Sequence, residues 1–128
     1  MNRLTTNLKL FLVCIMAVTN TGCENQSAPI SRAASTAEFA KFCAIYTEAL
    51  QKQTDYDTKS LEVINRVRLE TPNLVIFQDH LFSADSDQVE GFFMQASKQD
   101  TNKTMTCPAL TTFHSPETIR KYSQQFTD

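Results

Sequence analysis

The chain has no tryptophan, and it has only two glycines and two histidines among 128 residues. A phosphate-binding loop or a dinucleotide-binding fingerprint needs several closely spaced glycines, so neither kind of site can be built from this sequence. The G-x-S-x-G and H-E-x-x-H patterns of hydrolases and metalloproteases are absent as well. We therefore expect a protein that is not an enzyme and that carries no cofactor.

An excess of basic residues is also lacking, since 12 lysines and arginines stand against 14 acidic residues. No basic stripe exists, which argues against nucleic acid as a partner. His80 and His114 match no metal-ligand spacing, and neighbouring side chains such as Asp79 and His80 point in different directions on a helix. The sequence therefore predicts no metal site and two separate surface histidines.

Two acidic stretches deserve the same test for metal binding. The segment 85–91 is similar to a calcium loop, but valine and glutamate stand at its fifth and sixth positions, where the sixth must be glycine. Asp55 and Asp57 could be interpreted as a carboxylate pair, but acidic residues of this spacing are more typical of a solvated turn. We expect both stretches to be turns at helix starts.

The chain contains a single long apolar run, the nine residues Leu10–Val18. Arg3 and Lys9 precede it, and the small or polar residues Thr19–Gly22 follow it. The run is too short for a membrane-spanning helix of about 20 residues. Its three-part layout is typical of a secretory signal, so residues 1–22 are predicted to be a signal peptide.

The residues Thr21-Gly22-Cys23 resemble the lipobox of bacterial lipoproteins. That resemblance implies that Cys23 is lipidated through its sulfur and becomes the mature N-terminus. Asn20 departs from the pattern, which has an aliphatic residue at this position. The alternative is ordinary cleavage nearby, which leaves Cys23 as a free or paired thiol. Glu24, rather than aspartate, implies an outer-membrane destination in a Gram-negative cell.

The cysteine count bears on this choice. Of four cysteines, Cys14 is removed with the signal peptide. If Cys23 carries lipid, Cys43 and Cys107 remain, and an exported chain with two thiols is expected to join them. If Cys23 is not lipidated, three thiols remain and one is odd. No C-x-x-C spacing is present, so the pair is expected to be structural rather than redox-active.

Beyond the signal, the sequence divides into residues 23–35, predicted to be a flexible tether, and 36–128, predicted to be a single helical domain. The tether is polar and small in composition and contains Pro29. Such a stretch is equally typical of an ordinary disordered N-terminus. Without Arg3 and Lys9, ten basic residues stand against 14 acidic ones, so the mature net charge is −4.

Apolar residues recur at helical spacing in five segments of the domain. The predicted apolar stripes are Phe39, Phe42, Cys43, Tyr46 and Leu50; Leu61, Ile64 and Val67; Leu74, Phe77 and Leu81; Val89, Phe92, Phe93 and Ala96; and Ile119, Tyr122 and Phe126. Ser35 and Glu38 form a capping-box pattern that opens the first helix, which runs to about Gln53. Aromatic residues at this spacing are expected to form the core.

The predicted breaks between these helices are marked by turn and cap residues. Thr71-Pro72 opens the third helix, with the threonine as cap, and residues 83–87 form a turn and cap before the fourth. Residues 98–112 are rich in threonine and contain Pro108, so this segment is predicted to be extended. Ser115 and Pro116 open the last helix. The expected fold is all-α, a small bundle of four to five helices tied by one disulfide.

Two short motifs, FCAIYTEAL at Phe42–Leu50 and CPAL at Cys107–Leu110, carry a family resemblance. The chain resembles small, mostly uncharacterised exported bacterial proteins, often lipoproteins, with one cysteine in a first helix and a second in a C-terminal CPAL. The resemblance covers residues 39–110. It implies an all-helical, disulfide-tied domain and no assigned activity.

Together these features predict an envelope lipoprotein that acts without catalysis, by binding another protein or the cell wall, as immunity, exclusion or accessory lipoproteins do. Its membrane contact is expected only through the lipid on Cys23, on the periplasmic face of the outer membrane. The alternative function is a periplasmic stress chaperone. That alternative predicts a sharp and reversible rise in hydrophobic dye binding at acid pH.

Overall fold

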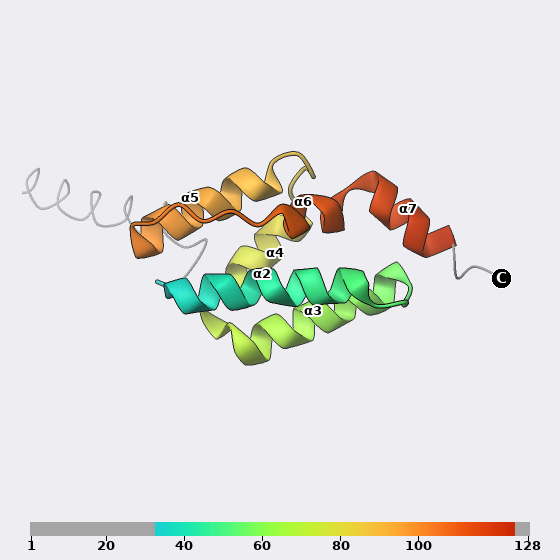
Figure 1. The fold of residues 1–128 in the computed structure, drawn as a ribbon, viewed down its shortest axis with the longest axis horizontal. Helices are drawn as coiled ribbons and strands as arrows, with labels where there is room; N and C mark the ends of the chain where they lie inside the picture. Colours follow the sequence, from blue (N-terminus) through green and yellow to red (C-terminus); the bar gives the residue numbers. More distant parts are fainter. Residues whose placement is uncertain (1–32, 125–128) are drawn as a thin grey trace, which may run out of the picture.

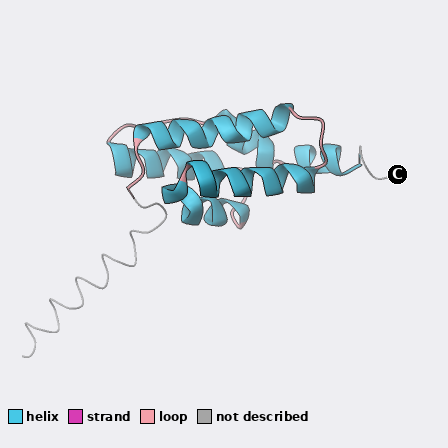
Figure 2. Ribbon diagram, turned by 90° about the horizontal axis from the view of Figure 1, so that it is seen from below, coloured by secondary structure: helices cyan, strands magenta, loops and turns pink. Residues whose placement is uncertain are grey.

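The computed structural model describes residues 33–124, and these residues form helices and loops without strands (Figure 2). The elements are α2 (Thr36–Gln51), α3 (Tyr56–Glu70), the short 3-10 helix η1 (Pro72–Leu74), α4 (Val75–Phe82), α5 (Val89–Thr101), α6 (Pro108–His114) and α7 (Pro116–Gln124). The all-helical class is confirmed, with six α-helices in this range instead of four to five. The predicted signal peptide, Cys23 and Phe126 lie outside the described residues.

The helices are arranged as two layers joined by α4. α2 and α3 form an antiparallel pair, and α5 lies on the opposite side of α2 (Figure 1). The chain after α5 returns along it to α6, which packs against both α2 and α5, and α7 extends beyond α6. Among residues 33–124, no helix combines the length and the hydrophobicity needed to cross a membrane.

Three helices begin at side-chain caps that the sequence marks. The Ser35 hydroxyl accepts a hydrogen bond from the Glu38 amide at 3.1 Å, and the Asp55 carboxylate accepts one from Thr58 at 2.7 Å. Ser115 caps α7 in the same way, accepting from the Thr118 amide at 3.2 Å. These bonds satisfy amides that have no partner inside their helix. The turn at residues 83–87, in contrast, supplies no side-chain cap to α5, so that part of the prediction is wrong.

The apolar stripe predicted for the second helix is only partly right. Val67 is buried as predicted, but Ile64 is half-buried and Leu61 is 61% exposed. The buried face is instead Lys59, Val63 and Val67, which follow one another in steps of four residues, and the aliphatic stem of Lys59 is buried with the two valines. The third stripe is confirmed, since Leu74, Phe77 and Leu81 are all fully buried.

The start of the third helix differs from the prediction in its cap. Thr71 does not cap it, because its hydroxyl donates back to the Val67 carbonyl at 3.1 Å. The chain instead turns through η1, with Pro72 at its first position, and α4 begins only at Val75. A proline at this position lacks an amide that would have no partner anyway.

The segment 98–112 is mostly helical, so the prediction of an extended segment is wrong at both of its ends. α5 continues to Thr101 and ends where Asn102 adopts a left-handed conformation with φ 61°. α6 begins at Pro108, again with proline at the first helical position. The β propensity of the threonines is overridden because Leu110 and Phe113 bury their side chains when the segment is helical.

The core is built from aromatic rings, as predicted. Phe39 and Phe93 meet edge to face with ring centroids 5.5 Å apart, and Tyr46 meets Phe113 in the same way at 4.9 Å. Such pairs add about 0.5–1.5 kcal/mol each beyond the area they bury. On α2 the face is slightly rotated from the predicted stripe, since Ile45 and Ala49 are buried and Cys43 and Leu50 only half-buried.

Candidate functional site

The predicted disulfide between Cys43 and Cys107 is present in the structure. Its Cα atoms lie 5.7 Å apart, within the usual range for such bonds. Cys107 is fully buried at the start of α6, and its amide donates to the Glu90 carboxylate on α5 at 3.2 Å. The bond therefore fastens the middle of α2 to the layer that contains α5 and α6.

The chain leads into the domain at one end of the bundle. The Ala34 amide donates to the Asp100 carboxylate at 2.9 Å, at the C-terminal end of α5. Two hydrogen bonds from Asn73, at 3.1 and 2.9 Å, reach the Glu38 carboxylate and fix the start of α2 to η1. We call residues 33–41, 66–76 and 98–103 the proximal end, because the predicted tether and Cys23 precede it directly.

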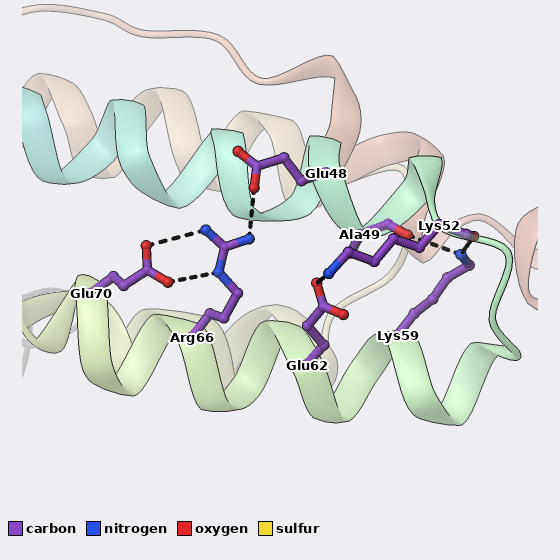
Figure 3. Close-up of polar contacts among 7 residues, drawn as sticks. All are labelled: Glu48, Ala49, Lys52, Lys59, Glu62, Arg66 and Glu70. Carbon is purple, nitrogen blue, oxygen red and sulfur yellow. Dashed lines mark hydrogen bonds and ion pairs between the residues drawn. The ribbon is translucent and has the colours of Figure 1, made fainter.

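A line of ion pairs joins α2 to α3 on the surface (Figure 3). Arg66 donates to Glu70 at 2.6 Å and 3.2 Å and to Glu48 at 2.8 Å. These hydrogen bonds raise the pKa of Arg66 and lower the pKa of Glu70. Lys52 and Glu62 pair at 2.7 Å further along the same pair of helices. The contacts hold the two helices in register and leave no carboxylate of this group free for chemistry.

Lys59 closes the C-terminal end of α2, a role that the sequence did not reveal. Its buried ammonium group donates to the carbonyl of Ala49 at 2.9 Å and to the carbonyl of Lys52 (Figure 3). It also lies 4.1 Å from the ring centroid of Tyr122. Burial lowers its pKa below the ordinary value. The last carbonyls of a helix lack partners within it, and here one cation supplies them.

His114 is not a surface residue, which corrects the prediction. Only 8% of it is exposed, and its ring centroid lies 4.9 Å from that of Phe82 and 5.9 Å from that of Tyr46. Its Nε2 has no hydrogen-bond partner among the described residues. Burial without a partner lowers the pKa of His114 to about 4. The prediction is wrong because it takes residues 98–112 to be extended. Without α6, nothing in the sequence indicates which face His114 lies on.

Two hydrogen bonds involve Tyr46 and Phe113, which pack against this histidine. The Gln78 side-chain amide donates to the Tyr46 hydroxyl at 3.1 Å, and the Tyr56 hydroxyl donates to the Phe113 carbonyl at 3.1 Å. Burial raises the pKa of Tyr56 to about 12 and also raises that of Tyr46. Both phenols therefore stay neutral at physiological pH and act as fixed hydrogen-bonding groups within an aromatic core.

The residues weighed as metal ligands do not come together. Within residues 33–124, no group of three or more histidines, cysteines and acidic residues is placed to hold a metal ion. Asp55 serves as the cap of α3, and Glu90 binds the Cys107 amide. His80 lies beside Phe92, with ring centroids 4.8 Å apart, and not near His114.

Apolar surface gathers at the corner between α3 and α4. Leu69 is 80% exposed, Ile76 is 43% exposed, and Pro72 between them is exposed as well. An open pocket of about 340 Å³ lies here, lined by Pro72, Asn73, Val75 and Ile76. We call Leu69, Pro72 and Ile76 the exposed corner. This exposed corner is not among the features predicted from the sequence. Leu69 does, however, lie off the predicted apolar stripe and close to the helix break at Thr71-Pro72, and these two facts together indicate an exposed apolar residue.

Comparisons of the chain with family models, with curated proteins and with solved structures find no match. The resemblance of Phe42–Leu50 and Cys107–Leu110 to exported lipoproteins therefore stays a prediction. The features of the described residues that bear on function are the disulfide, the proximal end and the exposed corner.

Proposed function

We propose that the protein is an envelope lipoprotein, anchored through Cys23, that acts without catalysis by binding another protein or the cell wall. The observation that supports this is the bond between Cys43 and Cys107. Disulfides form and persist in oxidising compartments outside the cytosol. The bond uses two of the three cysteines that follow Leu10–Val18, so Cys23 is the one that is left for a lipid.

The mode of action follows from what the described residues offer a partner. The domain is fixed internally by the disulfide, by the ion pairs of Arg66 and by Lys59, so its surface is presented as a rigid shape. Exposed apolar side chains such as Leu69 are typical of surfaces that bind other molecules when they occur in groups. Acidic residues outnumber basic ones by four in the predicted mature chain, which favours a partner of positive charge.

Two binding assays separate the two partner classes. Purified mature protein is sedimented with isolated peptidoglycan, and living cells that express photo-reactive variants at exposed positions are irradiated. Sedimentation with peptidoglycan supports the cell wall as partner, and a discrete cross-linked protein band supports a protein partner. The control is heat-unfolded protein for sedimentation and unirradiated cells for cross-linking. If neither assay gives a signal above its control, the binding role is contradicted.

A stress chaperone is a second candidate, favoured by His114. This residue is buried with its Nε2 unpartnered and with a pKa of about 4, so acid adds a charge inside the aromatic core. Release of α6 would then expose Phe113 and its neighbours to client proteins. Binding of a hydrophobic dye should rise sharply and reversibly below pH 5 if this candidate is right. A flat response would eliminate it.

A further inference from the structure

We propose that the proximal end of the bundle rests on the anionic bilayer that holds the anchor, with Leu69 among the lipid headgroups. The inference rests on the proposed anchoring through Cys23 and adds a second point of membrane contact. It concerns residues 33–41, 66–76 and 98–103, which lie together at one end of the molecule (Figure 1).

The length of the tether limits how far this end can move from the membrane. Ten residues separate Cys23 from Ala34, and even fully extended they span at most about 35 Å. The opposite end of α2 lies about 24 Å further away, because a helix rises about 1.5 Å per residue. The proximal end is therefore the part of the domain held nearest to the headgroups.

The exposed corner lies on this end. Leu69 lies in the last turn of α3 and is 80% exposed. The chain then turns back through Pro72 into α4. Ile76 follows in the first turn of α4 and is 43% exposed. Leu69 does not line the pocket of Pro72 and Ile76, and that pocket is open to solvent. An apolar side chain that projects beside an open pocket fits shallow insertion into a headgroup layer better than it fits an enclosed small ligand.

Charge separates this end from the rest of the domain. Its cationic side chains are Lys41, Arg66, Arg68, Lys98 and Lys103, against three carboxylates. All of these cations except Arg66 are exposed. The rest of residues 33–124 has four cationic side chains against nine carboxylates. The proximal end thus has net charge +2 and the remainder −5, which orients the domain with this end toward an anionic surface.

Helix dipoles explain only part of this distribution. Arg68 and Lys98 lie in the last turns of α3 and α5, where a cation is favourable in any protein. Lys41 lies in the N-terminal half of α2, and Lys103 lies beyond the end of α5. Lys41 also pairs with Glu70 on α3 at 3.9 Å. Neither the position of Lys103 nor the exposure of Leu69 follows from the dipoles, whereas membrane contact accounts for both of them together.

The test uses the mature lipidated protein in vesicles of phosphatidylethanolamine and phosphatidylglycerol. Leu69→p-benzoylphenylalanine is irradiated and its lipid adduct is read by intact mass. Leu61→p-benzoylphenylalanine is the matched control, because Leu61 is exposed on the same helix, about two turns away from Leu69 and outside the proximal end. We expect a lipid adduct from position 69 and none from position 61.

Charge is tested in the same assay. Replacing phosphatidylglycerol by phosphatidylcholine should lower the adduct yield at position 69 about fivefold or more, since each basic residue near an anionic surface is worth about that factor. Lys98→Glu together with Lys103→Glu should do the same. Arg120→Glu together with Lys121→Glu on α7, at the other end of the molecule, should leave the yield unchanged.

The outcomes separate this inference from the proposed anchor, because the intact mass also reports acylation. Acylated protein with equal adducts at both positions, or with none at position 69, overturns the inference while the anchor stands. A cross-link from position 69 to a second protein in cells, without a lipid adduct, assigns the exposed corner to a protein partner and also overturns it. Unacylated protein overturns the anchor and this inference together.

Discussion

The Cα atoms of Cys43 and Cys107 lie 5.7 Å apart, although the two residues are separated by 64 positions in the chain. The bond joins the α2–α3 pair to the layer of α5 and α6 at a point where both cysteines contact the hydrophobic core. A covalent link across so long a loop restricts the unfolded chain more than it changes the folded one. The stability of the domain should therefore depend on it strongly.

Removing the disulfide should cost a large part of the net stability. The double variant Cys43→Ser with Cys107→Ser should lose about 4 kcal/mol of the free energy of unfolding, as expected for closing a loop of this length. Urea denaturation of the oxidised domain, the reduced domain and the variant gives the measurement. Equal midpoints for oxidised and reduced protein would show that the bond contributes nothing to stability.

Replacing Lys59 should destabilise the domain, although most lysines lie on the surface and can be replaced at little cost. Lys59→Met keeps the buried stem but removes the donor to the carbonyls of Ala49 and Lys52, at a cost of about 2 kcal/mol. Lys121→Met is the matched control, because Lys121 also lies over Tyr122, at 5.1 Å, but is exposed. The control should change the free energy of unfolding by less than about 0.5 kcal/mol. Equal losses in both variants would assign the effect to the aromatic contact alone.

Acid should destabilise the domain through His114 before it protonates the carboxylates. The pKa of His114 is about 4 in the folded protein against an ordinary value of 6.5, so its contribution is complete above pH 6.5 and is lost as the pH falls toward 4. The loss amounts to about 3 kcal/mol at the low end of this window. The pKa values of Asp55 and Glu70 are lowered from their ordinary values of 3.8 and 4.5. The stability that these two carboxylates contribute is therefore lost only at lower pH.

The control for this prediction is His114→Phe, which keeps a planar ring beside Phe82 and Tyr46 and has no titrating group. The free energy of unfolding of the variant should be nearly constant between pH 6.5 and 4.5, while that of the wild type falls. Above pH 7 the two profiles should run parallel. A wild-type profile as flat as that of the variant would refute the role of His114.

The elements that the sequence predicts well are those with a strong local signal. The start of α2 at Ser35, its aromatic face and the helix that follows Ser115 all follow from caps and from four-residue spacing of large apolar side chains. The disulfide follows from counting, because two cysteines remain once the predicted signal peptide and a lipidated Cys23 are set aside. Such features depend on residues close together in the chain or on the residue type alone.

The features that could not be predicted from the sequence depend on packing between segments that are distant in the chain. Lys59 is buried only because the start of α3 meets the end of α2, and no local pattern marks a lysine as a cap for another helix. α6 is helical because Leu110 and Phe113 pack on α2, against the β propensity of its threonines. Half of the capping box also fails for this reason, since Glu38 binds Asn73 rather than its own helix start.

The proposed function depends above all on the lipid on Cys23, and intact mass spectrometry of the protein from the membrane fraction measures that lipid directly. We expect a chain that begins at Cys23 and carries acyl groups, and we expect Cys23→Ser to abolish the acylated species. Wild-type protein recovered without acyl groups, cleaved at another position and with Cys23 as a free or paired thiol, would contradict this expectation.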